Sequence, residues 1–168
     1  MRKIIILRGK SGAGKTTISE QLEKKIKGAV FVDIWKIKEI FEPLSLKDRK
    51  PTNQISKDSM FFIMKQSIKQ NVSNKFILQE SKQESVKKRL KNYLDKKDKI
   101  YSFFLDVDLE TALKRNKERS KANMPKKHFE EEAKEGLKKK EPEDILIDTS
   151  NKSIRQVVNK ILKDVGER

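Results

Sequence analysis

The chain has no cysteine among its 168 residues, and it lacks long apolar runs. Without thiols it can form no disulfide, no thiolate nucleophile and no zinc site built on cysteine, and a reducing cytoplasm is the expected location. The longest uninterrupted apolar run, Met60–Met64, is far shorter than the roughly 20 residues of a membrane-spanning helix. We therefore expect a cytoplasmic protein with no membrane partner.

Acidic residues are also few relative to basic ones. There are 25 Asp and Glu against 41 Lys and Arg, which gives a formal net charge of +16. Such an excess attracts anions, and nucleic acid is the most obvious candidate, but a lysine-rich solvated surface accounts for the same composition equally well. The length and the 35% of hydrophobic residues fit one domain, spanning 1–168. Charge alone does not choose a function.

Short apolar runs alternate with stretches of helical periodicity along the whole chain. Runs typical of buried strands are Ile4–Leu7, Ala29–Val32, Phe76–Leu78, Ile100–Leu105 and Ile145–Ile147. Helices are expected over Lys15–Lys27, Trp35–Phe41, a segment including Met60–Ile68, Val86–Leu94, Leu109–Lys117, Phe129–Lys139 and Ile154–Leu162. Loops are expected from Pro43 to about Ser56 and over Ser120–Lys127. This alternation predicts an α/β fold of three layers, with a five-stranded parallel sheet and helices on both faces.

A glycine-rich segment directly follows the first predicted strand. Gly9–Thr16 reads G-K-S-G-A-G-K-T and satisfies G-x-x-x-x-G-K-[ST], the P-loop pattern. Its glycines permit positive φ and bring backbone amides against phosphate oxygens, and a helix start adds its dipole. Lys15 would bridge the β- and γ-phosphates, and Thr16 would offer its hydroxyl to Mg²⁺. The predicted ATP-binding residues here are Gly9, Ser11, Gly12, Ala13, Gly14, Lys15, Thr16 and Thr17.

A P-loop alone does not distinguish a kinase from a GTPase. Switch GTPases recognise guanine with N-K-x-D, and neither Asn-Lys pair here continues that way: Asn74-Lys75 precedes Phe76-Ile77, and Asn151-Lys152 precedes Ser153-Ile154. The size and layout favour the small kinases, so we expect a P-loop NTPase fold that uses ATP and Mg²⁺.

Three stretches together carry a resemblance to a known family. These are the phosphate loop, Asp33–Lys36 just past the second strand, and a basic segment that includes Arg115, Arg119 and Pro125. The chain resembles P-loop kinases related to the polynucleotide 5′-hydroxyl kinase domain. The resemblance implies that Asp33 is the general base for the attacking hydroxyl and that Lys36 grips the acceptor's phosphate. It also implies a helical lid, at about 115–128, whose arginines reach over the ATP phosphates.

Two further positions resemble that family. Glu80 ends the third strand, where related kinases carry an acidic residue that binds acceptor or a magnesium-bound water, and Ser150 follows the fifth strand, where they cradle adenine. Plainer readings remain open at each position. Asp33 fits a helix N-cap, the two arginines fit a solvated basic face, Glu80 fits a strand-end carboxylate, and Ser150 fits an ordinary turn.

The acceptor-site stretches depart from the family pattern. Lys36 replaces an arginine, Ile34 replaces a frequent second aspartate, and Gln79–Ser81 replaces Asp-Thr-Asn. These departures favour a smaller acceptor. The net charge and the Asp33–Lys36 element favour nucleic acid, so our first interpretation is a kinase for an RNA or DNA 5′-hydroxyl. A kinase for a sugar, nucleoside, nucleotide or antibiotic hydroxyl is the alternative. A third, from a different class, is an ATP-binding switch that phosphorylates nothing.

Three side chains receive predictions of their own. Met60 and Met64 fit a core stripe better than a substrate pocket. Trp35 could stack on a base, but a lone tryptophan at a helix start more often packs in the core. His128 has no evident partner in the sequence, so we expect it to be exposed and inert.

Overall fold

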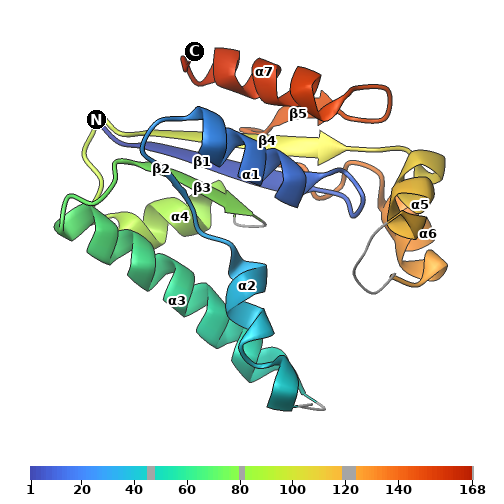
Figure 1. Ribbon diagram of the computed structural model, residues 1–168, viewed down its shortest axis with the longest axis horizontal. Helices are drawn as coiled ribbons and strands as arrows, with labels where there is room; N and C mark the ends of the chain where they lie inside the picture. Colours follow the sequence, from blue (N-terminus) through green and yellow to red (C-terminus); the bar gives the residue numbers. More distant parts are fainter. Residues whose placement is uncertain (45–47, 80–81, 119–123, 168) are drawn as a thin grey trace.

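The sheet is parallel throughout, as predicted. The computed structural model describes residues 1–44, 48–79, 82–118 and 124–167. Its strands lie in the order β2-β3-β1-β4-β5 (Figure 1). The strands are β1 (Lys3–Gly9), β2 (Ala29–Phe31), β3 (Lys75–Gln79), β4 (Lys99–Asp106) and β5 (Ile145–Asp148). The helices are α1 (Lys15–Lys25), α2 (Ile34–Glu39), α3 (Lys50–Lys69), α4 (Gln83–Leu90), α5 (Leu109–Lys117), α6 (Lys126–Glu135) and α7 (Ile154–Asp164), with a 3₁₀ turn over Glu42–Leu44.

The central strand β1 shows why helices cover both faces of the sheet. Successive side chains of a strand point to opposite faces, and every residue from Ile4 to Leu7 is buried. Ile5 and Leu7 join the apolar core beneath α1 and α7, whereas Ile4 and Ile6 join the core beneath α3 and α4 (Figure 1). This two-sided burial confirms the three-layer α/β fold.

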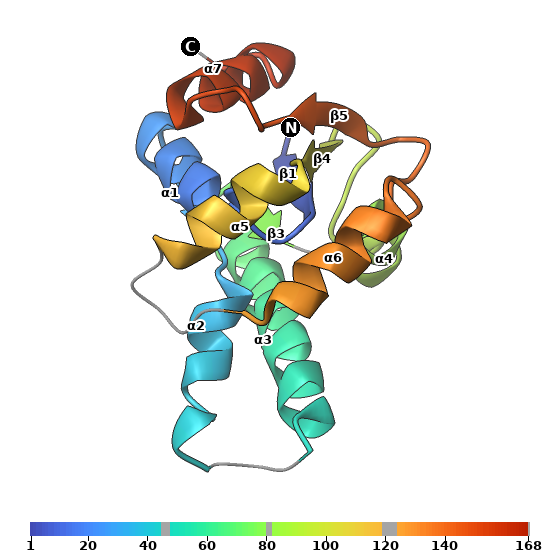
Figure 2. The same ribbon diagram turned by 90° about the vertical axis from the view of Figure 1, so that its right-hand side faces the viewer.

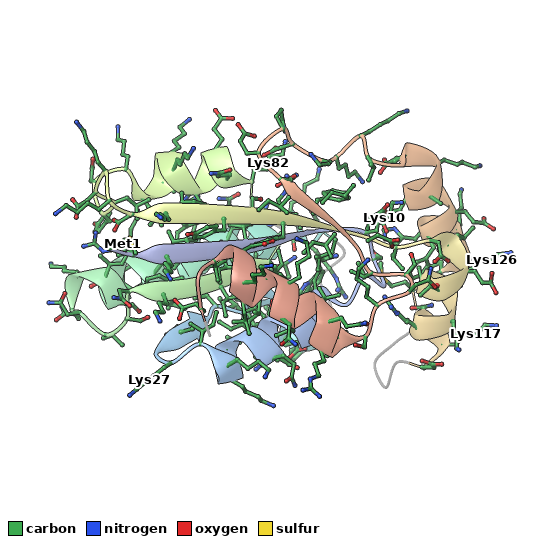
Figure 3. The ribbon with its side chains drawn as sticks, turned by 90° about the horizontal axis from the view of Figure 1, so that it is seen from above. Met1, Lys10, Lys27, Lys82, Lys117 and Lys126 are labelled. Carbon is green, nitrogen blue, oxygen red and sulfur yellow. The ribbon has the colours of Figure 1, made fainter. Side chains whose placement is uncertain are left out.

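The remaining elements gather at the carboxyl end of the sheet. Helices α5 and α6 lie beyond the end of β4 (Figure 1), and α2 and much of α3 project away from the sheet (Figure 2). Lys10, Lys117 and Lys126 lie toward this end, whereas Met1 and Lys27 lie toward the other (Figure 3). The carboxyl ends of parallel strands are where such sheets bind ligands. In the part of the chain described, no helix is both long and apolar enough to cross a membrane.

Each predicted strand is present within two residues of its expected bounds, but the loop expected from Pro43 to Ser56 is wrong over its second half. Helix α3 already begins at Lys50. Pro51 lies in its first turn, where a missing N–H breaks no helical hydrogen bond. The hydroxyls of Thr52 and Ser56 donate to the carbonyls of Arg49 and Thr52, so these polar side chains are buried without loss of hydrogen bonding.

The loop expected over Ser120–Lys127 ends earlier than predicted, because α6 begins at Lys126. Residues 119–123 lie outside the described part of the chain. The helix expected over Phe129–Lys139 stops at Glu135, just before Gly136, whose φ is +57°. Glycine adopts this left-handed conformation without strain and so ends the helix there.

Candidate active site

The phosphate loop connects β1 to α1 through three glycines in the left-handed region. Their φ angles are +126° at Gly9, +79° at Gly12 and +86° at Gly14. Gly14 is the N-cap of α1, so the helix begins at Lys15 as predicted. A Cβ on Gly9 would lie 2.0 Å from the carbonyl oxygen of Leu105, which leaves room only for glycine. The strand–loop–helix geometry of a phosphate-binding loop is therefore present.

Lys15 and Thr16 lie at the start of α1. The Lys15 ammonium donates to the carbonyl oxygens of Gly9 and Lys10, both at 2.9 Å, so it is held over the loop. The Thr16 hydroxyl lies 3.5 Å from Oε1 of Gln79, a side chain that is only 1% exposed at the end of β3. Thr17, also predicted to bind nucleotide, is exposed on the next position of the helix.

A hydroxyl and an amide oxygen suit Mg²⁺, which prefers oxygen ligands and keeps several waters. The donor set at Thr16 and Gln79 therefore fits the ion. Within the described residues, no group of three or more His, Asp or Glu side chains could hold a metal. Nucleotide phosphates and water would have to complete the coordination. Sequence reasoning missed Gln79, although its place at the end of a strand beside the phosphate loop was a usable signal.

Helix α5 packs directly against the phosphate loop. A Cβ on Gly12 would lie 2.9 Å from the Cα of Ala112, so the two backbones approach closely. Arg115 donates from Nη1 to the Gly12 carbonyl at 3.1 Å and from Nη2 to the Thr149 carbonyl at 2.7 Å. The arginine predicted for the lid is thus fixed between the phosphate loop and the segment after β5.

Ser150, predicted to lie near adenine, takes part in the N-terminal cap of α5. Its Oγ accepts from the Asp108 amide at 3.0 Å, and its own amide donates to Asp148 Oδ1 at 2.9 Å. The N-cap Asp108 accepts from the Thr111 amide and hydroxyl, which lowers the pKa of its carboxyl to about 2. The Ser150 amide likewise lowers the pKa of the Asp148 carboxyl. The turn interpretation of Ser150 describes these contacts well.

Asp33 is the N-cap of α2. Its Oδ1 accepts from the Trp35 amide at 2.9 Å, and the residue is 8% exposed. The capping interpretation is therefore correct, and it leaves open whether the carboxylate also acts on an acceptor. Lys36, the third residue of α2, is exposed. Asp33 and Lys36 thus open α2, with one side chain buried and one in solvent.

Trp35 is exposed, so its predicted place in the core is wrong. Ile34, at 4% exposure, takes the buried position at the start of α2, and Trp35 remains 44% exposed. The Lys38 ammonium lies 4.2 Å from the centre of the indole ring, a cation–π contact. Met60 and Met64 are fully buried, as predicted. Two other predicted site residues, Glu80 and Arg119, lie outside the described part of the chain.

His128 has hydrogen-bonding partners that were not evident in the sequence. Its Nε2 lies 2.9 Å from Ser11 Oγ, and Glu132 accepts from the Ser11 amide at 2.7 Å. His128 and Glu132 are four residues apart, so they share one face of α6. That spacing was the available signal, but nothing in the sequence showed that the face would meet the phosphate loop.

A buried ion pair braces the strand that leads into the phosphate loop. Arg8 Nη1 contacts the carboxylate of Asp144, and its Nη2 donates to the Lys139 carbonyl at 2.8 Å. The second oxygen of Asp144 accepts from the hydroxyl of Ser102 in β4. Because the charges are paired and hydrogen-bonded, the segment between α6 and β5 is fixed to β1 and β4. Sequence reasoning missed this pair, which joins residues more than 130 positions apart.

Comparison with known proteins gives one family and one fold. The family model AAA_18, described as an AAA domain, matches residues 5–138. No curated protein matches the sequence significantly. Among solved structures, the tunicamycin resistance protein of Deinococcus radiodurans is 19% identical, with a TM-score of 0.69 over 100% of this chain and 98% of that one.

Two further structures show the same fold. Shikimate kinase from Acinetobacter baumannii is 19% identical, with a TM-score of 0.61 over 98% of this chain and 93% of that one. A chain of an RNA repair complex is also 19% identical, with a TM-score of 0.68 over 90% of this chain and 50% of that one. The chain therefore belongs to the AAA_18 family, and its fold is that of the P-loop kinases.

Proposed function

We propose that this protein is an ATP-dependent phosphotransferase that moves the γ-phosphoryl group to a hydroxyl acceptor. The observation that carries the proposal is the strand–loop–helix geometry at Gly9–Thr16, with Lys15 held over the loop and Thr16 at its end. The shared fold supports it, since several of the similar structures are described as kinases.

Most of the rate of phosphoryl transfer comes from positioning and from charge stabilisation. In this site the loop amides and Lys15 would bind the phosphates, and Thr16, with Gln79 beside it, would hold Mg²⁺. The ion would neutralise charge on the phosphate oxygens. Arg115 already lies against the loop through the Gly12 carbonyl, and Arg119 would add a second cation from the lid. Ser150 would lie near the base of the nucleotide.

Asp33 is our candidate for the group that receives the hydroxyl proton. It is buried beyond the second strand, which places it at the carboxyl end of the sheet. An ionised carboxylate there could orient the acceptor oxygen and take its proton. Lys36, exposed on the same helix, would attract a phosphate of the acceptor, and Glu80 would contribute to the same region.

Our first candidate acceptor is the 5′-hydroxyl of RNA or DNA. The formal charge of +16, the Asp33–Lys36 element and the exposed Trp35 all favour a polyanion with stacking bases. The second candidate is a small molecule with a hydroxyl group, such as a sugar, nucleoside, nucleotide or antibiotic. Lys36 and Ile34, which lack the bidentate and second acidic groups of the family pattern, favour that alternative.

A transfer assay with labelled ATP tests both candidates. The protein is incubated with Mg²⁺ and a 5′-hydroxyl oligonucleotide, and in parallel with sugars, nucleosides and aminoglycosides, with Lys15→Ala as the inactive control. Label on the oligonucleotide establishes the first candidate, and label on a small molecule establishes the second. Label found only as free phosphate would instead favour the ATP-binding switch and overturn the transferase.

A further inference from the structure

Helix α6 holds the third residue of the phosphate loop through side-chain contacts that the motif does not predict. Glu132 Oε2 accepts from the Ser11 amide at 2.7 Å, and Glu132 Oε1 accepts from the Ser11 hydroxyl at 3.3 Å. Nε2 of His128 lies 2.9 Å from that hydroxyl and 3.4 Å from Glu132 Oε1. We call Ser11, His128 and Glu132 the Ser11 clasp.

The clasp contacts the loop from the side that packs on α5 and α6. A small pocket there is lined by both loop and helix residues, among them Ser11, Val107, Ala112, Phe129 and Glu132. Val107, Ala112 and Phe129 are each 3% exposed or less and belong to the apolar core. Glu132 therefore lies next to this apolar core, and its carboxylate accepts a hydrogen bond from the phosphate loop at Ser11.

Contacts to Ser11 matter because fixing this part of the loop in one conformation costs conformational entropy. Two glycines, Gly12 and Gly14, follow Ser11 closely, and glycine loses more conformational freedom on ordering than any other residue. Arg115 fixes the Gly12 carbonyl from α5, and Glu132 fixes the adjacent Ser11 amide from α6. The two helices thus hold consecutive residues of the loop. Helix α6 accepts from the amide of Ser11, and helix α5 donates to the carbonyl of Gly12.

We propose that Glu132 and His128 are positioning residues that hold the phosphate loop in its nucleotide-binding shape before ATP arrives. The inference rests on the proposed function, since it needs the loop to bind ATP. Preorganised donors contribute most when they need no rearrangement at binding. Glu132 supplies the charge-assisted bond to the loop backbone, and His128 orients the Ser11 hydroxyl next to it.

The test is the dissociation constant for ATP with Mg²⁺, measured by calorimetry on the full chain. Glu132→Ala is expected to weaken ATP binding about tenfold, the size expected from loss of a charge-assisted hydrogen bond. Glu132→Gln keeps an amide oxygen that can accept from Ser11 but loses the charge, so it should weaken ATP binding only about threefold. The matched control is Glu131→Ala: Glu131 is the next residue of α6, its side chain is 61% exposed, and it should leave ATP binding unchanged.

A double-mutant cycle assigns the role of His128. Ser11→Ala keeps the amide bond to Glu132 and removes only the hydroxyl, so it and His128→Ala should each weaken ATP binding about threefold, as expected for a neutral hydrogen bond. Combined, they should be no worse than Ser11→Ala alone, because that variant already removes the contact that His128 makes. Additive losses would overturn the part of the proposal that concerns His128.

Thermal unfolding of the same variants separates positioning from plain stability. A Glu132→Ala protein that melts earlier but binds ATP as the wild type does would overturn the inference, since the contact would then serve only the fold. Tighter ATP binding in Glu132→Ala would overturn it too, because the carboxylate would then compete with phosphate. Failure of the wild type itself to bind ATP would overturn the proposed function, and this inference with it.

Discussion

The two ends of the proposed reaction are built differently. We call the phosphate loop with α5 and α6 the nucleotide end, and α2, the 3₁₀ turn and α3 the acceptor arm. At the nucleotide end, side chains such as Arg115 and Glu132 bind the backbone of the loop directly. On the acceptor arm, large apolar side chains lie open to solvent; these include Trp35, Ile40, Leu44, Ile55 and Phe62.

The difference explains why the sequence predicts the class of reaction more readily than the identity of the acceptor. Phosphate is bound by backbone amides, and their geometry requires glycines at fixed positions, which leave a recognisable pattern. In our proposal, an acceptor would be recognised by exposed side chains on the surface of the arm, where many combinations would serve equally well. Variants that affect one end and spare the other therefore test whether the division is real.

The largest effect is expected at the nucleotide end, from Lys15→Ala. Its ammonium lies 2.9 Å from two carbonyl oxygens of the loop, those of Gly9 and Lys10. Removing it should lower phosphoryl transfer by about a thousandfold, the upper end of the range seen when one stabilising donor is lost. The measurement is label transfer from ATP. Lys24→Ala, an exposed lysine of the same helix α1, is the control and should transfer at the wild-type rate; activity left in Lys15→Ala would place the site elsewhere.

The second effect is expected where the two ends meet, from Asp33→Asn. Asparagine caps helices as well as aspartate does, so the bond to the Trp35 amide and the start of α2 should survive. Loss of a general base should still lower turnover about a hundredfold. We expect the ATP dissociation constant to be unchanged in calorimetry. Wild-type turnover in this variant would reduce Asp33 to its capping role.

Much of the fold could be predicted because local sequence and final packing agree. Ile4–Leu7 is buried on both faces of the sheet, and a continuous apolar run is the pattern of such a strand. The glycines at 9, 12 and 14 adopt the positive φ angles that the phosphate-loop pattern requires. In both cases the recognisable pattern is contained within a few positions of the chain.

What could not be predicted depends on contacts between distant segments. Glu132 meets Ser11 across 121 positions, and Arg8 meets Asp144 across 136. The start of α3 was missed because Pro51 and the polar residues around it are typical of a loop. Only the folded chain shows that the hydroxyls of Thr52 and Ser56 donate to carbonyls at the start of the helix. Partners of this kind become visible only when the chain is folded.

A smaller effect, on the acceptor side alone, is expected from Trp35→Ala. The indole is exposed beside Asp33 at the start of α2, and stacking of a base or ring on it would be worth about tenfold in the KM for the acceptor. The KM for ATP should not change, and Trp35→Phe should retain most of the affinity. The control is Val72→Ala, an exposed apolar residue in the turn between α3 and β3. An equal rise in both KM values would mean that the two ends are not separate.

The smallest effect concerns the cap that supports α5 at the nucleotide end. Hydrogen bonds from Thr111 hold the pKa of Asp108 at about 2, below the roughly 3.9 of an unfolded aspartate. A depressed pKa means that the ionised form stabilises the fold, so this contribution is complete above about pH 4 and is lost as the pH falls toward 2. Asp108→Asn still caps the helix but does not titrate. Urea unfolding should therefore give the wild type a larger free energy of unfolding than Asp108→Asn at pH 6, and this difference should shrink between pH 4 and pH 2. A difference that does not vary with pH would mean that the cap stabilises the helix through its geometry and not through its charge.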